Sequence, residues 1–441
     1  MADLVFRSRI SDRFAILTLS LALLGAASMI GYHLGLFIPR MLAVRALNGD
    51  SRGYSFGDDF YPIWLTARQW RIEHLDLYGR EMTREIQTGL FGHAIEPKDP
   101  MGRSTDYRQF AYPAFTDLLL WPAALLDFPR LRLLLAVVLP SLTALSIAFW
   151  ILALDWHISA LRLASIVVLT LGTYELLEAF FAEQPGLLVG FFLAGAALAL
   201  RRNRLLLAGV LMSLTMIKPQ VTILAAMYVL MWSFADRERK RFWLGFLSVV
   251  ACLVAASVWV WPHWIEEWIG ILAGYHRYAM PPLISVLLGP RLSVYVGPVL
   301  IAAALTVGAI LAWRTRRAGV ESQIFWWTVS LLLALTSIAL LPGQAIYDHV
   351  VLIPGILLVL QCWRRLRDAG PVSRTLLLAA AVVLMWPWVS AFALLVLRSI
   401  TPALSNSDAI FVMPIRTAAS LPFAVIALLG YLNPPQLRSK S

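Results

Sequence analysis

Ten segments of this chain are long runs of apolar residues, and they constrain the fold more than any other feature. A membrane-spanning helix needs about 20 predominantly apolar residues, within a range of about 17 to 25. Charged residues make up only 14% of the chain, whereas soluble proteins carry about 25%. We therefore predict an all-α polytopic membrane protein. The ten candidate spans are 15–38, 131–154, 163–182, 184–200, 241–261, 292–313, 322–341, 345–361, 375–397 and 409–431.

Two further apolar stretches, 113–128 and 205–234, are placed by the basic clusters around them. Such clusters prefer the cytoplasm, so an even number of crossings must separate consecutive clusters. This rule makes 113–128 an interfacial or re-entrant helix on the outer side, and 205–234 two short helices with Lys218 at their outer turn. We expect about 12 spans with both termini cytoplasmic. The clusters are Arg7/Arg9/Arg13, Arg201/Arg202/Arg204, Arg237/Arg239/Lys240/Arg241, Arg314/Arg316/Arg317, Arg364/Arg365/Arg367 and Arg438/Lys440.

The segment after the first predicted span differs from the rest of the chain. Residues 39–112 hold 10 basic and 10 acidic side chains, which is the charge density of a soluble domain. We predict one integral membrane domain over 1–441, in which 39–130 form a large extracytoplasmic loop with juxtamembrane helices. The first span could instead be a cleaved signal peptide, because basic residues precede it and small residues lie within it.

The net charge of +11 and the two cysteines exclude several classes of function. In a membrane protein a basic excess usually reports topology, so we expect no nucleic-acid partner. Cys252 and Cys362 lie far apart, in or beside apolar segments, which offers neither a CxxC metal site nor a disulfide framework. We expect no metal and no cofactor.

Ionisable side chains gather at the predicted outer ends of the helices. Such groups are costly at membrane depth, and each one is therefore a hypothesis for a functional site. Their distribution predicts a polar site at the outer membrane face, beside the large loop. The polar residues are Glu175, Glu178, Glu183, Gln184, Lys218, Asp348 and His349.

Adjacent carboxylates begin a candidate helix within the loop. Residues 57–70 read GDDFYPIWLTARQW, with apolar residues at helical spacing. We predict a helix lying on the membrane, with Asp58 or Asp59 at its start and Pro62 in its first turn, where proline is tolerated. An alternative role for Asp59 is only to cap this helix.

Six motifs follow one another along the chain: DDFYPIW (58–64), LYGREM (77–82), FAYPAF (110–115), EQPGLLVGFFLAGAALAL (183–200), LLLAGVLMSLTMIKPQ (205–220) and YDHVVLIP (347–354). Their order and spacing resemble glycosyltransferase family 87, a branch of the GT-C membrane glycosyltransferases. The resemblance covers about residues 15–360 and implies a GT-C-like fold with an extracytoplasmic active site.

The resemblance also implies a reaction. The family includes polyprenyl-phosphate-mannose-dependent mannosyltransferases of bacterial lipoglycan synthesis. We therefore expect a bacterial inner (plasma) membrane enzyme that moves a hexose, with mannose the first candidate, from a polyprenyl-phosphate donor to a glycolipid or glycan acceptor of the cell envelope. Transfer would invert the anomeric carbon, with an acidic residue of the first outer loop as general base. Asp59 matches that base best, and Asp58 is the other candidate.

Other residues match family positions or suit the same chemistry. A cation placed on the leaving phosphate would stabilise its charge, and Lys218 is our candidate; the alternative is a lysine that snorkels to the interface. His349 matches a position near the site and would bind donor phosphate or acceptor, or simply be a satisfied interfacial histidine. Gln184 matches a glutamine that glycine normally precedes, whereas Glu183 precedes it here. Tyr112 and Pro113 match a tyrosine-proline pair that we expect to shape the loop.

Two further features have weaker claims on the site. Glu175 and Glu178 share a helix face, and we favour polar support by them, with Glu178 near the substrate, over a metal site. Arg277 in YHRY (275–278) is a second phosphate candidate, with a surface charge as its alternative role.

Two other functions are compatible with many spans. A transporter or lipid flippase built from repeats should place broken helices at matching positions in two halves, but the charged loop and the break at Lys218 have no counterpart after residue 241. A membrane scaffold without catalysis would leave the outer carboxylates unexplained.

Overall fold

The computed structural model describes residues 2–47, 57–95, 107–275, 282–286, 288, 292, 295–343, 345–410 and 419–432. Helices dominate these residues, and their only β-bridge, between Pro282 and Pro342, belongs to no strand. The prediction of an all-α protein is therefore confirmed. Arg277 lies outside the described residues.

Five helical stretches are long and apolar enough to cross a membrane, and a bent pair adds a sixth. They indicate a membrane protein. The stretches are Ala15–Val44, Phe128–Ala153, Arg237–Val260, Gly297–Thr315 and Pro371–Ile400. The first joins α1 (Ala2–Tyr32), the π-helix η1 (His33–Phe37) and α2 (Ile38–Leu47), and the others contain α6 (Phe128–Ala153), η5 (Arg237–Arg239), α12 (Lys240–Val260), α16 (Gly297–Thr315) and α20 (Pro371–Ile400).

The bent pair corrects one sequence prediction. We expected one continuous helix over 163–182, whereas α7 (Ala160–Leu171) and α8 (Tyr174–Phe181) meet at 62°. Gly172 ends α7, and the Thr173 side chain accepts a hydrogen bond from the Leu176 amide, so that it caps the new helix.

Six shorter apolar helical segments coincide with predicted spans. They hold 10 to 17 residues, and a full crossing needs about 17 to 25, so the number of crossings stays a prediction. As predicted, 205–234 forms two short helices. The helices are α9 (Gly186–Arg201), α10 (Leu205–Leu214), α11 (Ile223–Phe234), α17 (Gln323–Ala339), α18 (Ile353–Gln361) and α22 (Leu421–Tyr431), with 3-10 turns η3 (Thr215–Ile217), η4 (Pro219–Val221) and η6 (Ile346–Leu352).

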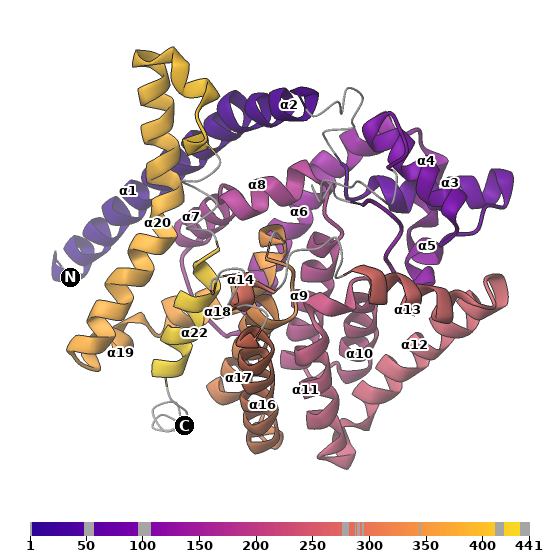
Figure 1. The fold of residues 1–441 in the computed structure, drawn as a ribbon. Coiled ribbons are helices and arrows are strands. Elements are labelled where there is room, and N and C mark those ends of the chain that lie inside the picture. Colours follow the sequence, from indigo (N-terminus) through magenta and orange to yellow (C-terminus); the bar gives the residue numbers. More distant parts are fainter. Residues whose placement is uncertain are drawn as a thin grey trace.

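The helices of the first loop form one cluster at a side of the molecule, in purple in Figure 1. Thr66 joins two of them by donating to Asp117 Oδ1 at 2.9 Å. The Trp64 indole donates to the Leu126 carbonyl at 2.9 Å, which ties the cluster to the start of α6. The cluster comprises α3 (Tyr61–Glu73), α4 (Arg80–Phe91), α5 (Ala114–Leu120) and the 3-10 turn η2 (Trp121–Leu125).

A large apolar core joins the loop helices to most of the other helices. Its buried side chains run from Phe60 to Leu432, and a second cluster, from Met29 to Ile410, packs α1 and η1 against α8 and α20. Helix α17 is at the centre of the large core, because residues 325–339 are all buried. Large apolar side chains such as Leu133, Trp259 and Leu378 are exposed on the outer helices, as lipid-facing residues would be. The remaining elements are α13 (Trp264–Tyr275), α14 (Leu283–Val286), α19 (Trp363–Asp368) and η7 (Pro402–Asn406).

Candidate active site

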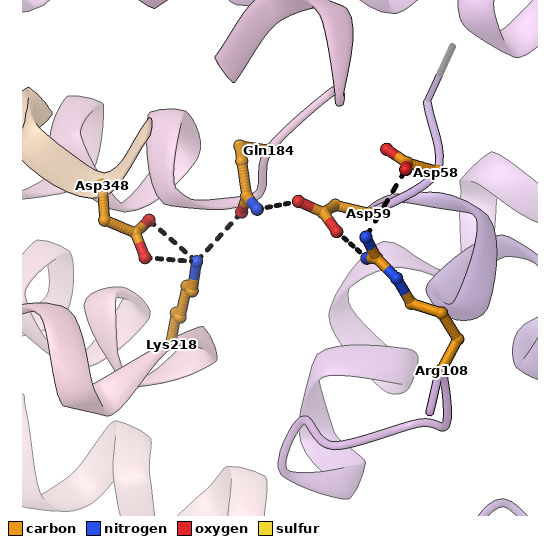
Figure 2. A network of polar contacts seen from close by, with 6 residues as sticks. All are labelled: Asp58, Asp59, Arg108, Gln184, Lys218 and Asp348. Atoms are coloured by element: carbon orange, nitrogen blue, oxygen red, sulfur yellow. Dashed lines mark hydrogen bonds and ion pairs between the residues drawn. The ribbon is translucent and has the colours of Figure 1, made fainter. Parts of the chain in front are cut away.

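Six polar side chains from five segments form an unbroken chain of contacts (Figure 2). The chain starts in the first loop, passes the turn between α8 and α9, and ends at η6 after crossing the break between α10 and α11. The residues, in order of contact, are Asp58, Arg108, Asp59, Gln184, Lys218 and Asp348.

Asp59 lies at the centre of this chain. Its Oδ1 accepts a hydrogen bond from Arg108 Nη1, and its Oδ2 accepts one from Gln184 Nε2. The backbone is fixed as well, because the Asp59 amide donates to the Ala182 carbonyl at 3.2 Å. Two protein donors therefore orient one buried carboxylate, and each of its oxygens keeps a further lone pair.

The segment before α3 turns sharply to deliver Asp59. Gly57 has φ +75°, and its amide donates to the Phe181 carbonyl at 2.9 Å. A Cβ on Gly57 would collide with the Glu183 carboxylate. Helix α3 then begins at Tyr61 with Pro62 in its first turn, as predicted, but its N-cap is Phe60, without a side-chain hydrogen bond. The capping role considered for Asp59 is therefore wrong.

Arg108 is the site residue that sequence reasoning missed. It bridges both carboxylates, because its Nη2 lies 3.4 Å from Asp58 Oδ2 while its Nη1 holds Asp59. The segment that carries it is irregular but anchored. The Tyr78 hydroxyl donates to the Tyr112 carbonyl at 2.8 Å, and the Trp268 indole of α13 donates to the Ala111 carbonyl at 3.0 Å. The sequence signal was its position two residues before the FAYPAF motif.

A tight helix end directs Gln184 at Asp59. The Gln184 amide donates to the Ala179 carbonyl at 2.9 Å and the Glu183 amide to the Phe180 carbonyl at 3.2 Å. These are the two bonds of a Schellman motif, whose left-handed residue is usually glycine. Glu183 occupies that position with φ +52°. The turn is thus formed without a glycine.

Lys218 is buried in an ion pair. Its Nζ lies 2.7 and 2.8 Å from the two carboxylate oxygens of Asp348, and 2.9 Å from Gln184 Oε1. A residue that precedes proline avoids the helical region, and Pro219 accordingly leaves Lys218 between two 3-10 turns. Its side chain is only 8% exposed, so the alternative of a lysine snorkelling at the interface is wrong.

Glycines let η6 approach α9 closely enough to place Asp348. A Cβ on Gly186 would collide with Asp348 Oδ1, and one on Gly190 would lie 3.1 Å from Val350 Cγ2. Gly186 is also the first residue of α9. The Asp348 carboxylate therefore lies at a helix N-terminus, where the helix dipole favours a negative charge.

His349 lies apart from this chain of contacts. It is buried in the wall of a cavity of about 130 Å³, which Glu175, Ile353 and Trp388 also line. Its neighbour Asp348 is in the network, so η6 separates the network from this cavity.

The other predicted residues have different neighbours. Tyr112 contributes its carbonyl to the loop anchor described above. Glu178 Oε2 lies 3.7 Å from His33 Nε2 of the π-helix, among the aromatic rings of Phe37 and Tyr174. Within the described residues, no group of three or more His, Cys, Asp or Glu side chains is placed to bind a metal ion.

The electrostatic balance of the network is negative. Three carboxylates face two cations when all are ionised. Glu183 adds a further carboxyl beside Gly57 and Asp58. Burial raises the pKa of Glu183 from 4.5 to about 7, although nearby Arg132 opposes the shift. An excess of carboxylates favours the uptake of a proton and opposes a further negative charge, so a bound anion would have to contact Arg108 or Lys218.

Comparison with known proteins identifies the family. The family model described as glycosyltransferase family 87 matches residues 110–342, which is more than half of the chain. This range contains Gln184 and Lys218 but ends before Asp348 and begins after Asp59 and Arg108. Searches of curated proteins and of solved structures found no match. On the family model, the chain belongs to glycosyltransferase family 87.

Proposed function

We propose that the protein transfers a hexose, with mannose the first candidate, from a polyprenyl-phosphate donor to a glycolipid or glycan of the cell envelope. Family membership makes it a glycosyltransferase and favours this activity over transport or a scaffold role. The observation that carries the mechanism is the Asp59 carboxylate, which is buried and held by two donors. The inferred site is extracytoplasmic, in the inner (plasma) membrane of a bacterium.

Asp59 would act as the general base of an inverting displacement. The acceptor hydroxyl loses its proton to Asp59 while its oxygen forms a bond to the anomeric carbon, and the bond from that carbon to the donor phosphate breaks on the opposite side. Arg108 and Gln184 each hold one carboxylate oxygen, so the base cannot rotate away from the acceptor. Asp58 shares Arg108 and is the second candidate.

Lys218 would stabilise the phosphate that leaves. An ammonium has three N–H donors, and they face Gln184 and the two oxygens of Asp348. Because Asp348 needs only one of those donors to remain paired, the phosphate can take another. Gln184 links Lys218 to Asp59, which places the proposed base and the proposed cation on either side of one amide.

The remaining predicted residues would bind or shape the substrates. We assign the apolar cavity beside His349 to a part of the polyprenyl chain beyond the phosphate, because apolar side chains dominate its wall and η6 separates it from Lys218. His349 would bind the donor through that chain. Tyr112 would shape the loop, and Glu178 would support the site through His33.

The test is sugar transfer by purified protein from a polyprenyl-phosphate hexose. Asp59→Asn should lower the rate by about a hundredfold or more, since a general base contributes about 10² to 10⁴. Asp58→Asn should have a smaller effect. The matched control is Glu85→Gln, which removes an exposed carboxylate of the same loop and should keep full activity. Full activity in both aspartate variants would reject the base assignment, and failure of the wild type with every lipid-linked sugar would reject the donor class.

A further inference from the structure

An apolar cleft lies between α18, α20 and α22, outside the polar network of the site and next to the cavity beside His349. Its volume is about 530 Å³. It lies in the part of the chain after residue 342, where the family model no longer matches. In Figure 1 these helices are the orange and yellow ones near α19. The walls are made by Ile356 and Leu360 of α18, Leu378 and Ala381 of α20, and Leu421 and Val425 of α22.

Two arginines close one end of this otherwise apolar cleft. Arg367 of α19 and Arg374 of α20 line it together with Trp363. Their orientation is fixed by the Nε atoms, because Arg374 Nε donates to the Arg367 carbonyl at 2.8 Å and Arg367 Nε donates to Asp368 at 2.9 Å. Arg367 is ion-paired with Asp368, and its guanidinium lies over the Trp363 ring, 5.0 Å from the ring centroid. Within the described part of the chain, the terminal nitrogens of neither guanidinium donate a hydrogen bond. Planar guanidinium groups suit phosphate oxygens.

The length of the cleft matches one leaflet of a bilayer. Along α20 it runs from Arg374 to Leu384, and ten residues of α-helix rise about 15 Å. That is half of a hydrocarbon core about 30 Å thick. The arginine end belongs to a basic cluster that the positive-inside rule assigns to the cytoplasm. The cleft therefore has a cationic end at the level of the inner headgroups and an apolar end near the midplane.

We propose that this cleft is a binding site for an anionic phospholipid of the cytoplasmic leaflet. Its phosphate would lie between Arg367 and Arg374, and one acyl chain would fill the space between α18, α20 and α22. The charge of the site selects an anionic headgroup, and its depth selects a chain that stays within one leaflet. The end of the cleft near the midplane adjoins the cavity beside His349, since Leu384 lines both spaces. The phospholipid would thus support the wall of that cavity from the cytoplasmic side.

The experiment compares lipids bound to the purified full-length protein. Delipidated protein is mixed with micelles that contain phosphatidylglycerol, phosphatidylcholine or polyprenyl phosphate, or with inorganic phosphate alone. Retained lipid is measured by native mass spectrometry and stability by thermal unfolding. We expect phosphatidylglycerol to be retained and to raise the unfolding temperature, while phosphatidylcholine and inorganic phosphate do so at least about tenfold less effectively.

Two pairs of variants make the assignment specific. Arg367→Gln/Arg374→Gln should weaken phosphatidylglycerol binding about tenfold or more, whereas Arg364→Gln/Arg317→Gln removes two exposed arginines outside the cleft and should leave it unchanged. Ala381→Phe should block the chain, and exposed Ala379→Phe, on the same helix but outside the cleft, should not.

Several results would overturn the proposal. Equal binding by the cleft variants and their controls would show that the lipid lies elsewhere. If inorganic phosphate stabilised the protein as much as phosphatidylglycerol does, the cleft would be a site for anions and not for a lipid. Preferential retention of polyprenyl phosphate would assign the cleft to the donor. These experiments measure lipid binding and stability, not sugar transfer. Rejection of the lipid site would therefore leave the proposed glycosyltransferase activity untouched.

Discussion

Glu183 is a carboxyl group whose ionisation opposes folding. Its pKa is raised from 4.5 to about 7 by burial, so the folded protein keeps a proton that the unfolded chain releases between these values. The contribution of protonated Glu183 to the free energy of unfolding is therefore fully present below about pH 4.5, and it is lost as the pH rises through 7. Glu183→Gln should leave the free energy of unfolding unchanged near pH 4.5 and raise it by about 1 to 3 kcal/mol above pH 8, as measured by thermal unfolding. A gain that is independent of pH would contradict this interpretation, and Glu85→Gln is the exposed control.

The pair of Lys218 and Asp348 separates stability from chemistry. Either Asp348→Asn or Lys218→Met leaves one charge buried without its partner, which should cost about 3 to 5 kcal/mol. The double variant Lys218→Met/Asp348→Leu removes both charges and should recover most of that loss. It should nevertheless remain inactive in sugar transfer if Lys218 stabilises the leaving phosphate. Chemical unfolding measures the first effect and turnover the second; single variants as stable as the wild type would contradict the buried ion pair.

At the residue scale the sequence identified most of the network. Gln184, Lys218 and Asp348 were found because polar groups are rare and costly at the ends of apolar helices. Asp59 was found because adjacent carboxylates begin a candidate helix and because it matches the base that the resemblance implies. Arg108 was missed for the opposite reason. It is one of ten basic residues in a loop that also holds ten acidic ones, where it stands out only by its position two residues before the FAYPAF motif. Only the folded segment, anchored by α13 and Tyr78, shows that it faces Asp59.

At the level of elements, the packing of η6 on α9 depends on Gly186. A methyl group there would displace the Asp348 carboxylate and, through it, Lys218. Gly186→Ala should therefore reduce sugar transfer about tenfold or more, with a loss of stability. Gly270→Ala is the matched control, because a Cβ at that helical position meets no atom within 4 Å. Wild-type turnover in Gly186→Ala would show that the site tolerates movement of η6.

Element boundaries could be predicted where the cause is local. The break at Lys218 follows from Pro219, and the short helices on either side were expected. The bend between α7 and α8 depends on Thr173, whose capping signal is weak within an apolar run. How closely η6 approaches α9 could not be predicted, because it arises from contacts between residues far apart in the chain, such as Gly190 and Val350.

For the whole molecule, the pattern of apolar and basic residues predicted a helical membrane protein but not its internal order. Helix α17 looks like any other span in the sequence, yet residues 325–339 are buried on every side. Helices α12 and α16 are about as apolar as α17, yet they remain largely exposed. Burial within the bundle is therefore decided by packing between helices, which hydropathy does not encode.

The orientation of the whole chain is open to a direct test. Basic clusters placed in the cytoplasm predict that exposed positions His93, His263 and Thr401 face outside, and that Asn203, Arg317 and Asp368 face inside. After Cys252 and Cys362 are replaced by alanine, single cysteines are introduced at these positions. A membrane-impermeant maleimide should label the first three in intact cells and the last three only after permeabilisation. Where two consecutive labelled positions lie on opposite sides of the membrane, the chain between them crosses it an odd number of times. Labelling of Asn203 from outside would reverse the helices around Lys218 and place Asp59, Gln184 and Lys218 at the cytoplasmic face, where an extracytoplasmic donor could not reach them.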